Sequence, residues 1–144
     1  MLAAVGDYAL PALAQQGPIQ AWIVDDTGIP KKGQHSVGVA HQYCGQLGKQ
    51  ASCQVAVSLS VANDQASLPI AYRLYLPQSW AEAPARREKA GVPKEIRFQT
   101  KPEMALGQIR QALAEGVPHG AVLCDAAYGN HFDFRQELTP ILFS

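Results

Sequence analysis

Two short apolar runs each end in aspartate, and these aspartates are the residues best suited to chemistry. The first run, residues 21–26 (AWIVDD), ends in Asp25 and Asp26, and the second, residues 120–125 (GAVLCD), ends in Asp125. Because burial of a carboxylate is unfavourable, aspartate is depleted in strands, and two such strand ends suggest a function. If the two strands are parallel neighbours, their carboxylates meet at one edge and repel each other. A divalent cation that prefers oxygen ligands, Mg²⁺ or Mn²⁺, would relieve that repulsion.

A metal ion held in this way is suited to phosphoryl transfer, where it activates a hydroxyl or water and stabilises charge at phosphorus. The alternative is structural. An aspartate after a strand can cap the following turn or helix, and Asp26-Thr27-Gly28 is good turn chemistry. Adjacent residues of a regular strand point to opposite faces, so only one of Asp25 and Asp26 can face a metal site.

The elements that must position these carboxylates follow from local patterns. We expect a buried strand at residues 20–26, followed by a turn at Gly28, Pro30 and Gly33. Residues 51–62 alternate apolar and small polar side chains, which predicts a half-buried strand. The pattern resumes at residues 68–76, which predicts a hairpin partner for that strand. No strand is expected at residues 34–50, which are polar and rich in glycine.

The second half of the chain predicts an insert, a helix, a strand and a second helix. Residues 77–101 read as an irregular surface insert with one helical turn at residues 84–90. A capping box of Thr100 and Glu103 starts the helix, which Gly116 stops. The strand at residues 120–125 follows, and a helix at residues 131–138 is expected to break at Pro140. Three early antiparallel strands, a helix crossover and a strand parallel to the first predict an α/β fold with a mixed sheet.

Composition fits one globular domain of 144 residues, with 12 basic and 12 acidic side chains. The resulting net charge of zero gives no overall footprint of a nucleic-acid partner. The charges are uneven, however, since residues 1–30 carry three aspartates and no Lys or Arg, whereas residues 80–101 carry six basic residues and three glutamates. Three scattered cysteines indicate a reducing, cytoplasmic location, and we expect neither a signal peptide nor a membrane span.

The stretches VDDTGIPKKG and AVLCDAAYGN, with the hairpin and insert between them, resemble the DDE transposases of bacterial insertion sequences, the branch called DDE superfamily endonucleases. The resemblance covers about residues 18–139. It implies an RNase H-like core in which two aspartates and a glutamate hold two Mg²⁺ ions that cut and rejoin DNA at transposon ends. Carried over, it makes Asp125 the second catalytic aspartate and favours Asp26, next to Thr27, as the first. Asp25 then takes an outer role.

One part of the family pattern is absent. The family's glutamate lies well downstream of the second aspartate, whereas Asp133 and Glu137 follow Asp125 by only 8 and 12 residues. We therefore expect a truncated transposase core that is inactive alone, with residues 1–17 an N-terminal remnant or helix and residues 18–144 a partial catalytic domain. Such truncation predicts an exposed apolar sheet edge near the C-terminus and self-association.

Basic residues suggest where DNA would bind. Lys31 and Lys32 closely follow the first carboxylates, and Arg86 and Arg87 lie in the basic insert, so all four are candidate phosphate contacts. A solvated surface explains them as well.

Two other classes of function compete with the transposase interpretation. They are an RNase H-like nucleic-acid-binding or interaction domain without catalysis, and a hydrolase with two carboxylates that acts on a small phosphorylated substrate in a closed pocket. His41, Cys44 and Cys53 raise a zinc site, but no fourth ligand is apparent in the sequence.

Overall fold

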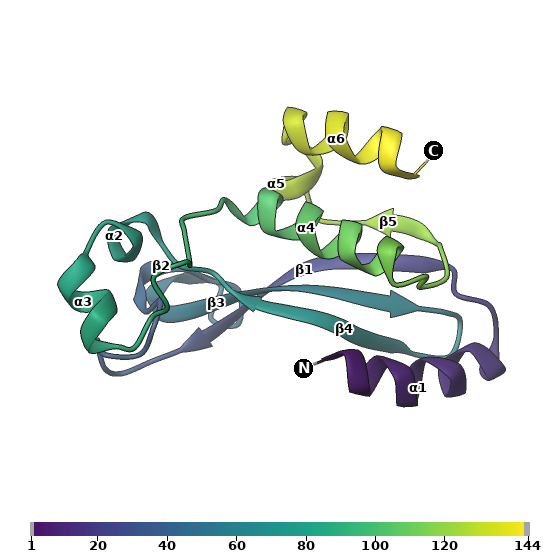
Figure 1. Cartoon of the computed structure of the whole chain (residues 1–144), viewed down its shortest axis with the longest axis horizontal. Coiled ribbons are helices and arrows are strands. Elements are labelled where there is room, and N and C mark those ends of the chain that lie inside the picture. Colours follow the sequence, from purple (N-terminus) through teal and green to yellow (C-terminus); the bar gives the residue numbers. More distant parts are fainter. Residues whose placement is uncertain (1, 143–144) are drawn as a thin grey trace. The chain divides into compact units, whose positions relative to one another are not determined.

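The computed structural model describes residues 2–142 (Figure 1). The chain forms two compact units, each built from separate segments. Unit 1 comprises Met1–Asp25, Ser58–Tyr72 and Pro102–Ser144, and unit 2 comprises Asp26–Val57 and Arg73–Lys101.

Helices and strands alternate along the chain as expected of an α/β fold. In order they are α1 (Leu2–Gln16), β1 (Ala21–Pro30), β2 (Ala40–Cys44), β3 (Lys49–Ala62), β4 (Ser67–Leu74), α2 (Gln78–Ala81), α3 (Pro84–Lys89), α4 (Lys101–Ala114), β5 (Ala121–Leu123), α5 (Ala126–Gly129) and α6 (Phe132–Leu142). The strands hydrogen-bond in the order β2-β3-β1-β5, and β4 also pairs with β3. The predicted mixed sheet, consistent with an RNase H-like fold, is confirmed.

In unit 1, β5 lies parallel to the first half of β1, with Ala21 opposite Ala121 and Ile23 opposite Leu123. Gly120 permits this close pairing, because a Cβ atom there would come within 2.5 Å of the Ala21 nitrogen. The crossover helix α4 lies alongside β5 (Figure 1). The buried face of α4 carries Met104 and Ile109, which are 3% and 0% exposed. One face of α4 therefore supplies core residues of unit 1.

The hairpin of β3 and β4 closes through the predicted turn after residue 62. Asn63 Oδ1 accepts hydrogen bonds from the backbone N–H groups of Gln65 and Ala66. Its Nδ2 donates to the carbonyls of Leu13 and Gly17, at 2.9 and 3.1 Å, which holds the end of α1 against this turn. One asparagine thus shapes the hairpin and anchors the N-terminal helix of unit 1.

Unit 2 has a core of its own, which makes the expectation of a surface insert at residues 77–101 wrong in part. Trp80 is fully buried with Val39 and Leu76, and five further apolar residues pack against this cluster. The indole N–H of Trp80 donates to the Val39 carbonyl at 2.7 Å. Helices α2 and α3 therefore cover an apolar cluster instead of lying loosely at the surface.

Strand β2 was not expected, because its sequence has no apolar alternation. It pairs antiparallel with β3 in a register that runs from Ala40 opposite Cys53 to Cys44 opposite Lys49. Backbone hydrogen bonds to β3 form this strand, and Cys44 buries its thiol beside Cys53 and Val55.

The predicted turn at Gly28 and Pro30 is also wrong, since β1 continues to Pro30 and the Lys31 N–H bonds to the Ser52 carbonyl at 2.9 Å. Gly28 allows a close approach of strands instead of a turn: a Cβ atom there would lie 2.9 Å from Cys44 Sγ and 3.1 Å from the Gly45 nitrogen.

Helix α6 passes through Pro140 and ends at Leu142, so the predicted break at that proline is wrong. Pro140 cannot donate to the carbonyl of Gln136, but it lies in the last turn, where only two more helical residues follow. The Thr139 hydroxyl donates to the Arg135 carbonyl at 2.9 Å and supports this final turn.

Candidate active site

Asp25 and Asp125 both lie in unit 1, Asp25 inside β1 and Asp125 two residues after the end of β5. The register of β1 and β5 ends with Ile23 opposite Leu123, and two further residues along each chain lead to Asp25 and Asp125. Residues opposite each other in a sheet point to the same face. Both aspartates are exposed, and the Ser58 hydroxyl donates to the Asp25 carbonyl at 3.4 Å. Asp25 therefore continues the strand face of Ile23, whereas Asp125 lies after the end of β5, at the N-cap of α5.

Asp125 also caps a helix, as the structural interpretation of a strand-end aspartate predicted. Its Oδ1 accepts hydrogen bonds from the backbone N–H groups of Ala127 at 3.0 Å and Tyr128 at 3.3 Å. Tyr128 is buried and packs against Phe134 of α6, with ring centroids 5.9 Å apart. Because both hydrogen bonds end on Oδ1, the carboxylate is oriented by the backbone and Oδ2 makes no hydrogen bond within the described part of the chain.

Cys124 precedes this aspartate and is half-buried. Burial, and then the negative charge of Asp125, raise the pKa of the Cys124 thiol. The thiol therefore stays protonated at neutral pH and has little tendency to act as a nucleophile.

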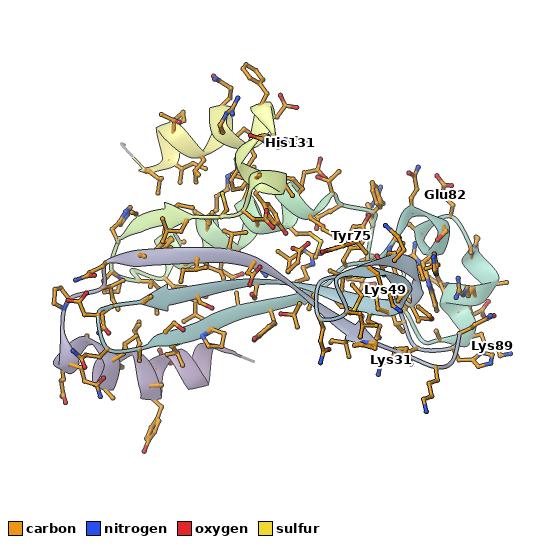
Figure 2. The ribbon with its side chains drawn as sticks, turned by 180° about the vertical axis from the view of Figure 1, so that it is seen from behind. Lys31, Lys49, Tyr75, Glu82, Lys89 and His131 are labelled. Carbon is orange, nitrogen blue, oxygen red and sulfur yellow. The ribbon has the colours of Figure 1, made fainter. Side chains whose placement is uncertain are left out.

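Asp26 lies in unit 2, where it forms an ion pair. Lys101 Nζ, at the start of α4, is 3.0 Å from Asp26 Oδ2, and both side chains are about 30% exposed. The same ammonium lies 5.2 Å from the ring centroid of Tyr75, which is labelled in Figure 2. Nothing in the local sequence links residue 26 to residue 101, although the capping box at Thr100 marks the start of the helix that carries this lysine.

The four basic residues expected to contact DNA divide into two kinds. Arg86 stacks 3.8 Å above the Trp80 ring and donates to the Gln34 carbonyl at 3.0 Å, while Arg87 donates to the carbonyls of Ala81, Pro93 and Ile96. These arginines hold unit 2 together. Lys32 is exposed and Lys31 is half-exposed just after β1, and neither makes a side-chain hydrogen bond within residues 2–142.

No group of three or more His, Cys, Asp or Glu side chains within residues 2–142 is arranged to hold a metal ion. Of the two acidic residues that follow Asp125, Glu137 pairs with Arg110 at 2.8 Å and Asp133 lies in the first turn of α6.

The structure does not favour a zinc site at His41, Cys44 and Cys53, the residues that suggested one. Cys44 and Cys53 are free, fully buried thiols, and burial together with the neighbouring Cys44 raises the pKa of Cys53. His41 is exposed on β2. The raised pKa of Cys53 opposes the thiolate form that zinc requires.

In the described residues, no helix is both long and apolar enough to cross a membrane.

Comparison with known proteins identifies the family. Residues 2–141 match the model of the DDE superfamily endonucleases. Over 107 residues, 74% of this chain, the sequence is 33% identical to a probable transposase for insertion sequence element IS701 from Microchaete diplosiphon, of which the match covers 25%. The match thus spans about a quarter of that relative, and no solved structure matches significantly. The family model covers nearly the whole chain, both strand-end aspartates included, and the chain belongs to the DDE superfamily endonucleases.

Proposed function

We propose that this chain carries part of the catalytic core of a transposase, which cleaves and transfers DNA strands with a divalent metal ion, and that Asp25 and Asp125 are its metal ligands. Membership of the DDE superfamily endonucleases and the similarity to a probable insertion-sequence transposase support the reaction class. The observation that supports the residue assignment is the β1–β5 register, which ends with Ile23 opposite Leu123, two residues before each aspartate.

The chemistry of the two carboxylates supports this assignment. Both aspartates are exposed, and carboxylate oxygens are the ligands that Mg²⁺ and Mn²⁺ prefer. The cap on α5 engages Oδ1 of Asp125 through two backbone N–H groups, which orients the carboxylate and leaves Oδ2 for a cation. Ligands oriented by a second set of contacts bind metals better than freely rotating ones.

Asp26, which the sequence favoured, is a less suitable ligand than Asp25. Its carboxylate already has a cationic partner in Lys101 at 3.0 Å, and a metal ion would have to compete with that ammonium. Because strand neighbours face opposite sides, Asp25 and Asp26 are not interchangeable. We propose that Asp26 keeps its ion pair and that Asp25 binds the metal.

A bound divalent ion would supply the activation of a hydroxyl or water and the stabilisation of charge at phosphorus. The chain's own contribution is to hold two carboxylates at one sheet edge. Residues 2–142 hold no group of three or more His, Cys, Asp or Glu side chains arranged for a metal ion. We therefore propose metal binding for this chain, and strand cleavage only for a core in which a further acidic ligand is supplied.

The test is a calorimetric titration with Mn²⁺, together with its effect on the melting temperature, for the wild-type chain and three variants. Asp25→Asn and Asp125→Asn are expected to abolish the heat of binding and the rise in melting temperature, whereas Asp26→Asn is expected to retain both. Asparagine keeps the capping oxygen at position 125, so loss of binding there is not a consequence of a lost helix cap.

Retained binding in Asp25→Asn, with loss in Asp26→Asn, would return the assignment to Asp26. A wild-type chain that neither binds Mn²⁺ nor gains stability from it would instead favour the catalytically inactive RNase H-like binding domain. That alternative is supported by the lack of a third acidic ligand in residues 2–142.

A further inference from the structure

The chain's zero net charge conceals two oppositely charged units. Unit 2 contains ten basic and four acidic side chains, a formal net charge of +6. Unit 1 contains two basic and eight acidic side chains, a formal net charge of −6. Since each unit is assembled from separated segments, this segregation is a property of the fold that a count along the sequence conceals.

Three of the ten basic residues of unit 2 are used within the unit. Arg86 and Arg87 donate to backbone carbonyls, and Lys101 pairs with Asp26. The other seven make no ion pair or side-chain hydrogen bond within residues 2–142, and all are exposed except the half-exposed Lys31. These free cations of unit 2 are Lys31, Lys32, Lys49, Arg73, Lys89, Lys94 and Arg97.

The acidic residues of unit 2 offset few of these cations. Asp26 is paired with Lys101, and Glu82 accepts a hydrogen bond from Gln78 at 2.8 Å. Glu88 and Glu95 are exposed and lie in the segment of α3 and the loop after it. Unit 2 therefore presents a surplus of exposed positive charge that is not paired within the unit, as expected of a surface that binds a polyanion.

We infer that unit 2 binds the phosphate backbone of duplex DNA without regard to sequence, through the lysines Lys31, Lys32, Lys49 and Lys89. Figure 2 shows three of them on different elements of unit 2: Lys31 after β1, Lys49 at the start of β3 and Lys89 at the end of α3. A lysine ammonium is a compact charge that contacts phosphate oxygens but reads no base. The choice of DNA as the polyanion rests on the proposed function, whereas the positive surface does not.

The contacts within unit 2 alter the set of basic residues that we expect to bind DNA. Arg86 and Arg87 are replaced as candidates, because their guanidinium groups already serve the core of unit 2. Lys49, 17 residues beyond Lys32 in sequence, enters as a contact that no local pattern indicated.

The test measures binding of the full chain to a short duplex of arbitrary sequence by fluorescence anisotropy over a series of salt concentrations. Replacing Lys31, Lys32, Lys49 and Lys89 by Gln together is expected to weaken binding at low salt about tenfold or more. It is also expected to reduce the slope of log K against log salt by roughly 3 to 4, since each phosphate contact contributes about 0.9.

Two controls separate charge from folding. The matching variant with Arg at the same four positions keeps the charge and is expected to bind like the wild type. Arg110→Gln removes a positive charge from unit 1, where Arg110 is about half exposed, and is expected to leave DNA binding unchanged. Circular dichroism checks that each variant folds.

A lysine-to-glutamine variant that binds as tightly as the wild type would overturn the inference, as would wild-type binding without salt dependence. A second copy of the chain is the competing partner, because its unit 1 carries the opposite charge. If sedimentation shows salt-sensitive self-association that the Gln variant loses, while the wild type binds no duplex, the surface serves that contact and the DNA assignment is wrong.

Failure here and failure of the proposed function are distinguishable. DNA binding by Asp25→Asn and Asp125→Asn is expected to persist, because neither change touches unit 2. Loss of Mn²⁺ binding with intact, salt-dependent DNA binding would reject the metal site alone, and the reverse result would reject the DNA surface alone.

Discussion

The two units of this protein are built around similar cores but carry opposite surfaces. Each buries one of the chain's two tryptophans completely, Trp22 in unit 1 and Trp80 in unit 2. Each indole N–H donates to a backbone carbonyl at 2.7 Å, that of Pro118 for Trp22 and that of Val39 for Trp80. Their formal net charges have opposite signs, −6 for unit 1 and +6 for unit 2.

The net charge of a chain is therefore a poor guide to its binding partners when the folded units are assembled from separate segments. The net charge of the whole chain is zero, yet unit 2 carries a formal charge of +6. The proposed metal ligands belong to the acidic unit, whereas the proposed phosphate contacts belong to the basic unit. The two proposals can therefore be tested separately.

The largest expected effect comes from removing either core tryptophan. Trp22→Ala and Trp80→Ala are each expected to lower the free energy of unfolding by about 3–5 kcal/mol, because each leaves a large cavity and an unpaired carbonyl. Urea denaturation followed by circular dichroism measures the change. Tyr8→Ala, at an 88% exposed position, is the control and should change stability by less than about 0.5 kcal/mol.

The same two residues report on whether the units unfold together. Trp22→Phe leaves a single tryptophan, which lies in unit 2, and Trp80→Phe leaves one in unit 1. Since β1 and β3 each contribute residues to both units, we expect the fluorescence and circular dichroism midpoints of each variant to coincide. Separate transitions would show that the two units are independent in stability as well as in charge.

An intermediate effect is expected at Gly28. Gly28→Ala places a Cβ atom 2.9 Å from Cys44 Sγ and 3.1 Å from the Cys44 Cα and Gly45 nitrogen, so the backbone of the β2–β3 hairpin must shift. We expect a loss of about 1–3 kcal/mol in urea denaturation. Gly45→Ala in the same hairpin meets no atom within 4 Å and serves as the matched control. Equal stability of the two variants would contradict the close approach of the strands.

The smallest effect is expected at the Asp26–Lys101 ion pair. Because both side chains are about 30% exposed, a double-mutant cycle with Asp26→Asn and Lys101→Met is expected to give a coupling energy of about 0.2–1 kcal/mol. That coupling should decrease in high salt. A coupling near zero at low salt would remove the main argument for excluding Asp26 from the metal.

Elements with a strong local pattern were predictable, and elements formed by distant partners were not. The alternation in β3 and the capping box of α4 predicted those elements nearly to their ends, and the order of elements predicted the parallel pairing of β1 with β5. Strand β2 was missed because its hydrogen bonds come from β3 and its own sequence has no apolar alternation. The second half of β1 was missed because Gly28, which resembles a turn signal, instead allows two strands to approach closely. The core around Trp80 was missed because its residues come from segments about 40 positions apart, Val39 and Trp80 being 41 apart.

The amino-acid sequence alone predicted that two apolar runs end in aspartate, that the chain is α/β, and that its motifs resemble the DDE family. It also indicated that Asp25 and Asp26 face opposite ways, because side chains alternate along any strand. The register of β1 with β5 and the ion pair of Asp26 with Lys101 were visible only in the fold, since their partners lie about a hundred and 75 residues away. The separation of charge into two units likewise arises from the fold, because folding gathers distant segments whose charges cancel when they are counted along the chain.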